Sequence, residues 1–209
     1  MADQLVTTAQ IKARLFPAGV SDAADDTLIS ELIDQVSGWI ENYTGRKFVA
    51  ETGATYVFDT EAGYTLRIPR GIRTITSMGV ALTHQPDSGG SYTTIAAADR
   101  ILRPKAQELP EGWPYFEVRF SRGTLAGTIS RFANAENGCT ITGNFGWATV
   151  PQDIQAVTID AVVAAYQNRA NGASSTLGAD STALPPWSTF FGRGSPQRGT
   201  LDRYRWPSL

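Results

Sequence analysis

Residues 26–48 constrain the fold most, because they repeat apolar side chains at the spacing of an α-helix. Polar residues fill the other side, so the pattern predicts an amphipathic helix with one buried face. Asp25 and Asp26 suit the positive end of its dipole, and Gly45 favours its end. The residues expected on the buried face are Leu28, Ile29, Leu32, Ile33, Val36, Trp39, Ile40 and Tyr43.

Two more helices are expected. Thr7 and Gln10 match a capping box, which predicts a short helix at residues 7–16. Pro151 opens a helix at 151–172 whose apolar residues spread over most of its circumference, so we expect it to be covered on more than one side. It is either a buried central helix of one subunit or a close-packed seam between subunits. The seam residues would be Val157, Ala161, Ala164 and Ala165.

Between residues 49 and 146 the apolar period shortens toward two and turn residues recur, which predicts an antiparallel β region. Residues 69–71, Pro-Arg-Gly, are expected to form a turn. The expected strands are 55–59, 64–68, 72–80, 92–95, 100–103, 115–120 and 139–145. The predicted fold class is therefore α+β: a small helical bundle at 1–48 and 147–171, an inserted antiparallel β region at 49–146, and an extended C-terminal arm at 172–209.

The last 38 residues change composition. A Gly/Ser/Thr-rich stretch typical of linkers is followed by large aromatic residues among prolines and arginines. Aromatic residues with arginine are typical of interface anchors, so we predict a contact with another protein or a neighbouring subunit. The alternative is that this arm folds back on its own domain. The predicted contact residues are Trp187, Phe190, Phe191, Arg203, Tyr204, Arg205 and Trp206.

The sequence offers little for catalysis or cofactor binding. It contains one histidine, His84, one cysteine, Cys139, and no glycine-rich nucleotide-binding loop, so we expect no catalytic residue, cofactor or metal ion. The net charge of −2 gives no overall attraction to nucleic acid or membranes. No apolar run reaches membrane length and the first residues do not resemble a signal peptide, so we expect a protein made in a cytoplasm-like compartment.

Three arginines flank the predicted turn at 69–71. If Arg67, Arg70 and Arg73 share one edge, they could contact phosphates. A solvated sheet rim or a salt-bridged subunit contact is the alternative interpretation.

The chain resembles the head–tail connector (adaptor) proteins of tailed bacteriophages, which dock under the portal. The resemblance covers residues 5–170 and depends on the order and spacing of three stretches. The matching stretches are LISELIDQVSGWIENYTGRKF, YTLRIPRGIRTITSM, and ITGNFGWATVPQDIQAVTIDAVVA, in which a strand leads through Val-Pro into an alanine-rich helix.

The resemblance implies a structural virion protein and not an enzyme. Copies, typically twelve, would form a ring that extends the DNA channel, links the capsid to the tail or next connector, and lets DNA pass without specific binding. The implied partners are the portal protein, sister copies and the next connector or tail-completion protein, assembled in the host bacterial cytoplasm. The aromatic arm would then contact the portal or a neighbouring copy, the alanine-rich helix would form the ring seam, and the three arginines would face the channel or its rim.

A competing hypothesis assigns the function to the β region. In this interpretation a β-rich module of a phage structural protein presents aromatic side chains to a glycan or a receptor. The candidate aromatic residues are Tyr92, Trp113 and Tyr115.

Overall fold

A computed structural model describes residues 3–16, 23–85, 90–105, 109, 112–120, 131–171, 190–192 and 194–205. The chain forms two compact units. We call Met1–Val49 with Val150–Leu209 the helical unit, and Ala50–Thr149 the β unit. The α+β fold class expected from the sequence is confirmed.

The helical unit begins with α1 (Thr8–Leu15) and α2 (Ala23–Thr44). Thr7 caps α1 through the predicted capping box: its hydroxyl accepts from the amide of Gln10, and the Gln10 side chain accepts from the amide of Thr7. Helix α2 ends at Gly45, whose φ of 66° closes the helix in the conformation that glycine adopts readily. The buried face of α2 includes Ile29, Leu32, Ile33, Val36 and Ile40, as the sequence pattern predicted.

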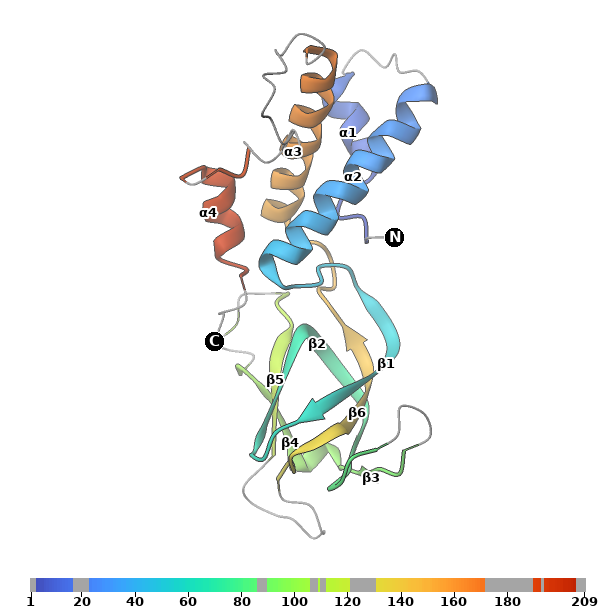
Figure 1. Cartoon of the computed structure of the whole chain (residues 1–209), viewed down its shortest axis with the longest axis vertical. Helices are drawn as coiled ribbons and strands as arrows, with labels where there is room; N and C mark the ends of the chain where they lie inside the picture. The colour runs from blue at the N-terminus through green and yellow to red at the C-terminus, as the bar shows by residue number, and fades with distance from the viewer. Residues whose placement is uncertain are drawn as a thin grey trace, which may run out of the picture. The chain divides into compact units, whose positions relative to one another are not determined.

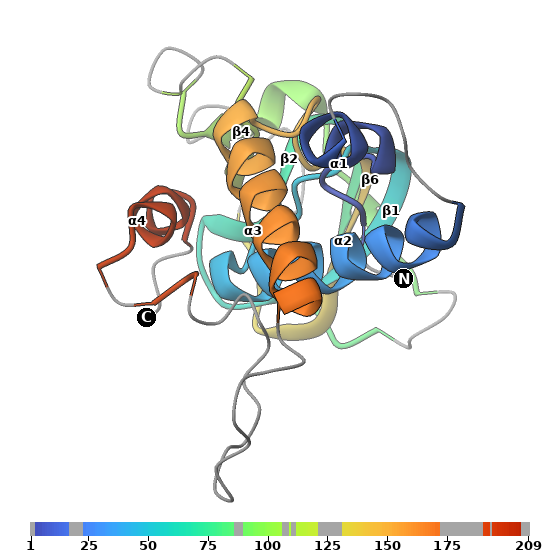
Figure 2. The same ribbon diagram turned by 90° about the horizontal axis from the view of Figure 1, so that it is seen from above.

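The third helix, α3 (Gln152–Asn171), packs against α1, α2 and α4 (Pro196–Asp202). This confirms that α3 is covered on more than one side. Figures 1 and 2 show α4 on the side of α3 opposite α1. Helix α4 lies in the region expected to be extended, so the prediction of an extended arm is not confirmed. Ser195 caps α4, and Pro196 suits the first helical turn because it needs no amide partner there.

The β unit contains one antiparallel sheet in the described residues, with the strand order β1-β6-β2-β5-β4 and β3 paired to β2 (Figure 1). Alternating side chains put one face of the strands into an apolar core. The strands are β1 (Glu51–Thr60), β2 (Thr65–Val80), β3 (Thr93–Thr94), β4 (Arg100–Arg103), β5 (Tyr115–Phe120) and β6 (Ala135–Phe145), with a 3-10 turn at Ala97–Asp99.

The prediction of a turn at residues 69–71 is wrong, because these residues lie inside the 16-residue strand β2. The first part of β2 pairs with β5, and the part from Ile72 onward pairs with β6. Gly71 has a φ of 74° where the register with β5 shifts, which is the arrangement of a β-bulge. Pro69 falls between the registered pairs Arg67–Glu117 and Ile72–Tyr115, so its missing amide proton removes no bond of the regular ladder.

Candidate assembly surfaces

The described part of the C-terminal region packs on α2 through aromatic rings. Phe191 is 3% exposed and stacks on Trp39, with ring centroids 4.2 Å apart. Trp39 in turn stacks on Tyr43 at 5.1 Å, and Phe190 meets Phe191 edge-on at 5.3 Å. For residues 190–192 and 194–205 the chain therefore folds back on its own unit, which is the alternative left open by the sequence.

Polar contacts fix α4 beside this aromatic stack. The Tyr43 hydroxyl donates to Asp202 Oδ1 at 2.5 Å and accepts from Arg198 Nε at 3.0 Å. The guanidinium groups of Arg198 and Arg205 lie 5.4 and 5.5 Å from the centroid of the Tyr43 ring, within cation–π range. Tyr43 thus contacts three side chains of the C-terminal segment. In the sequence, its i, i+4 spacing from Trp39 indicated only that the two residues share the buried face of α2.

Tyr204 joins the end of the described C-terminal segment to the start of α3. Its hydroxyl donates to the Asp153 carboxylate at 2.8 and 2.9 Å, and its carbonyl accepts from Arg46 Nε at 3.0 Å. Its ring meets Phe48 edge-on at 5.6 Å. Burial, reinforced by the Asp153 carboxylate, raises the pKa of Tyr204, and burial lowers the pKa of Arg46 to about 10.

The residues predicted to contact a partner therefore differ in accessibility. Phe191 and Tyr204 are buried within the helical unit, and Phe190 is half-buried. Arg203 and Arg205 are exposed. Trp187 and Trp206 lie outside the described residues.

The predicted seam residues of α3 lie mostly inside the helical unit. Val157, Ala161 and Ala165 are buried, and Ala164 is half-buried. The free side of α3 instead presents Ala156 and Asp160.

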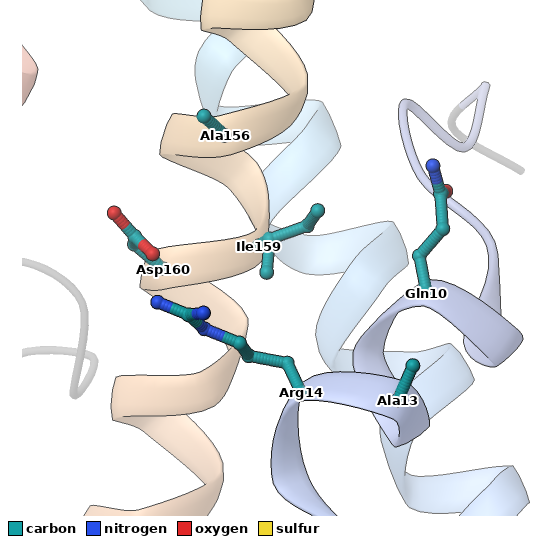
Figure 3. Close-up of a pocket in the computed structure, with 6 residues that line it drawn as sticks. All are labelled: Gln10, Ala13, Arg14, Ala156, Ile159 and Asp160. Carbon is teal, nitrogen blue, oxygen red and sulfur yellow. The ribbon is translucent and has the colours of Figure 1, made fainter. Parts of the chain in front are cut away.

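A groove of about 330 Å³ lies between α1 and α3. Its lining combines short apolar side chains with one basic and one acidic group, and Figure 3 shows the Arg14 guanidinium pointing toward the Asp160 carboxylate. Sequence reasoning missed this groove, although the wide apolar spread of α3 indicated an additional apolar side. The lining residues are Gln10, Ala13, Arg14, Ala156, Ile159 and Asp160.

Arg67, Arg70 and Arg73 all lie on β2 and have different surroundings. Arg70 contacts Glu51 at 3.4 Å and the Tyr56 hydroxyl at 3.2 Å, and its guanidinium lies 4.5 Å from the centre of the Tyr56 ring. Arg73 is half-buried and Arg67 is exposed. The salt bridge of Arg70 therefore lies within its own chain, whereas the alternative interpretation expected one between subunits.

The aromatic residues of the competing hypothesis contact their own chain. Tyr92 donates its hydroxyl to the Asn137 carbonyl at 3.0 Å. Trp113 meets Trp147 edge-on at 5.9 Å, and Tyr115 is half-buried.

The two potentially reactive side chains, His84 and Cys139, differ in accessibility. His84 Nδ1 lies 3.2 Å from Glu136 Oε2 at the surface. Cys139 is fully buried, and burial raises the pKa of its thiol to about 12. Within the described residues no three His, Cys, Asp or Glu side chains are close enough together to hold a metal ion. The described helices also include none with the length and apolarity needed to cross a membrane.

Comparisons with known proteins give structural matches only. No protein-family model matches the chain, and no curated protein sequence matches it. A chain from the structure "Neck of empty GTA particle computed with C6 symmetry" matches with a TM-score of 0.55 and 16% identity, over 100% of this chain and 94% of that one. A chain from "Virion of native gene transfer agent (GTA) particle" matches with a TM-score of 0.52 and 16% identity, over 98% and 91%. The protein therefore has the fold of a chain found in the neck of a phage-like gene transfer agent particle, as the sequence resemblance to phage connectors led us to expect.

Proposed function

We propose that the protein is a structural component of a virion neck, an adaptor that assembles as a ring under the portal and links the capsid to the tail or the next connector. The observation that carries this proposal is the fold match to a particle neck, because it covers nearly the whole of both chains. A match of that extent includes both the helical and the β unit, so it does not depend on one common supersecondary motif.

A ring with sister copies fits the symmetry named for that neck. Six-fold symmetry is compatible with the twelve copies that the family resemblance implies. In a closed ring each copy uses two different surfaces, one for each neighbour. We assign one of these surfaces to the free side of α3 and the groove beside it, since Ala156, Ile159 and Ala164 leave apolar surface there that is not fully covered. Val157, Ala161 and Ala165 then support this surface from inside.

We assign the portal contact to the outer side of the C-terminal segment. Arg203 and Arg205 are exposed there, and Phe190 of the same segment is half-buried. Phe191 and Tyr204 act indirectly in this proposal, because their burial holds the segment in place. Arginine is common in protein interfaces, where its planar guanidinium forms paired hydrogen bonds with carboxylates.

The test is assembly of the full-length protein with the portal protein of the same particle, followed by light scattering and native mass spectrometry. We expect a ring-sized complex. The proposed function is wrong if the protein neither self-associates nor joins the portal.

Point variants test the portal contact better than a truncation, because removing the segment would uncover the side chains that it buries on α2. Arg203→Gln with Arg205→Gln should weaken portal binding without unfolding the chain. Gln35→Glu with Asn42→Asp, at two exposed positions of α2, changes the net charge equally and should have no effect. Equal binding by both double variants would refute the assigned contact and leave the ring proposal standing.

A further inference from the structure

Strand register brings together three arginines that are far apart in the sequence. Arg67 of β2 pairs with Glu117 of β5, and Glu117 also pairs with Arg103 of β4, so the three residues form one row across three strands. Arg119, two residues along β5, belongs to the next row, between Thr65 and Ile101. We call Arg67, Arg103 and Arg119 with Glu117 the arginine face.

This face is opposite the apolar core of the sheet. On β5 the alternate residues Phe116, Val118 and Phe120 are buried, and on β2 Leu66 and Ile68 are buried. Side chains alternate between the two faces of a strand, so Glu117, Arg119 and Arg67 emerge on the other side. Arg103 shares that side, because directly paired residues of neighbouring strands point the same way.

The arginine face is locally cationic on an acidic protein. Three arginines and one glutamate give it a charge of +2, against −2 for the whole chain. Among the described residues, none of its arginines forms a side-chain hydrogen bond or an ion pair, in contrast to Arg70 with Glu51. Its guanidinium groups are therefore available to an external anion.

We propose that the arginine face contacts the phosphate backbone of double-stranded DNA without reading its sequence. The choice of DNA among polyanions rests on the proposed function, because a ring that links the capsid to the tail would surround the DNA channel that the connector resemblance implies. Interfaces with DNA are polar and strongly positive, whereas the cores of protein interfaces are poor in charged residues. Ile101, 40% exposed, is the large apolar side chain on this face. One such side chain provides too little apolar surface for a hydrophobic contact with another protein.

The spacing of the arginines suits a charged rod more than a single anion. Neighbouring strands lie about 4.8 Å apart, which separates Arg67 and Arg103 by about 10 Å across β5. Double-stranded DNA carries about one charge per 1.7 Å of its axis, so several phosphates lie within that span in any orientation. The contact needs no precise register and permits the DNA to slide.

A three-phosphate contact has a defined salt dependence. With three charges neutralised, the logarithm of the binding constant should fall by about 2.7 per decade of salt, or about 40-fold between 50 and 200 mM. Binding should be weak at physiological salt and independent of sequence.

The test is fluorescence anisotropy of the full-length protein with labelled random-sequence duplex DNA over that salt range. The triple variant R67Q/R103Q/R119Q should lose at least tenfold in affinity at 50 mM salt, along with most of the salt dependence. The matched control is Q35E/N42D/Q167E, which lowers the formal net charge by the same three units, from −2 to −5, at exposed positions of the helical unit that are not among the residues assigned to the proposed contact surfaces. The control should keep the wild-type salt slope.

Equal losses in the two triple variants, or no binding by the wild type at 50 mM salt, would overturn the inference. It is also wrong if R67Q/R103Q/R119Q keeps DNA binding and fails to assemble with sister copies, since the face would then contact protein. Light scattering with the portal separates this inference from the proposed function: a variant that joins the ring normally leaves the adaptor proposal intact whatever its DNA affinity.

Discussion

Replacing Tyr204 with phenylalanine tests how the C-terminal segment is held. The substitution keeps the ring that packs on Phe48 and removes the hydroxyl that donates to the Asp153 carboxylate. A hydrogen bond to a charged group contributes about 1.5–3 kcal/mol net. Asp153 is half-buried, so water replaces part of the lost bond, and we expect a loss of about 1.5 kcal/mol in the free energy of unfolding.

Urea unfolding followed by circular dichroism measures this loss, and a double-mutant cycle with Asp153→Asn isolates the pair. Asparagine keeps an oxygen that can accept from the Ile154 amide, as Asp153 does, so the cycle disturbs the helix start little. The coupling between positions 204 and 153 should be about 1 kcal/mol. Hydrogen exchange should show the largest increase at the amides of α4, because Tyr204 holds that helix to the start of α3.

The pH dependence gives a second readout. Tyrosine in the unfolded chain ionises at about pH 10, whereas Tyr204 in the folded protein has a raised pKa because of burial and the nearby carboxylate. Its contribution is thus complete below about pH 10 and declines as the pH rises toward the folded-state pKa. The stability difference between wild type and Tyr204→Phe should therefore narrow above pH 10. A loss below about 0.5 kcal/mol with no coupling to Asp153 would refute the proposed docking role.

Three further predictions concern single positions. Cys139 is buried with a raised thiol pKa of about 12, so a disulfide reagent near pH 8 should label only unfolded protein; rapid labelling of folded protein would contradict its burial. Gly71→Ala should lower the stability of the β unit by more than the roughly 1–3 kcal/mol expected from backbone strain alone, because the new Cβ would also lie 2.7 Å from Pro114 Cγ. Gly53→Ala, at a φ of 67° with no atom within 4 Å, should cost less in thermal unfolding; equal losses would argue against the clash. Gly199→Ala, in open space inside α4, should stabilise the protein by about 0.4–1 kcal/mol, and a lower urea midpoint would contradict this.

Local sequence patterns were sufficient to predict an element where the contacts that stabilise it are local. The capping box at Thr7, the end of α2 at Gly45, and the strands Arg100–Arg103 and Tyr115–Phe120 all occur where the sequence placed them. Capping bonds span three residues and strand alternation has a period of two, so both are visible in a short window. The order of these patterns also supported the connector resemblance.

Only the tertiary structure decided the role of features that depend on distant partners. A Pro-Arg-Gly sequence fits a turn and also a bulge, and pairing of β2 with both β5 and β6 selected the bulge. Composition marked the aromatic residues after position 187 as buried in some interface, but contacts from Trp39 and Asp153 show where Phe191 and Tyr204 lie.

The candidate sites likewise depended partly on sequence pattern and partly on tertiary structure. The sequence singled out Arg67 as a phosphate contact, together with Arg70 and Arg73, because the three are close along the chain. The structure pairs Arg70 with Glu51 and places Arg67 on the same sheet face as Arg103 and Arg119. Periodicity alone determined which side of each strand is polar, whereas strand register determined which polar side chains share a face. The physical reason is that register depends on hydrogen bonds between strands separated by dozens of residues, and no local pattern encodes that pairing.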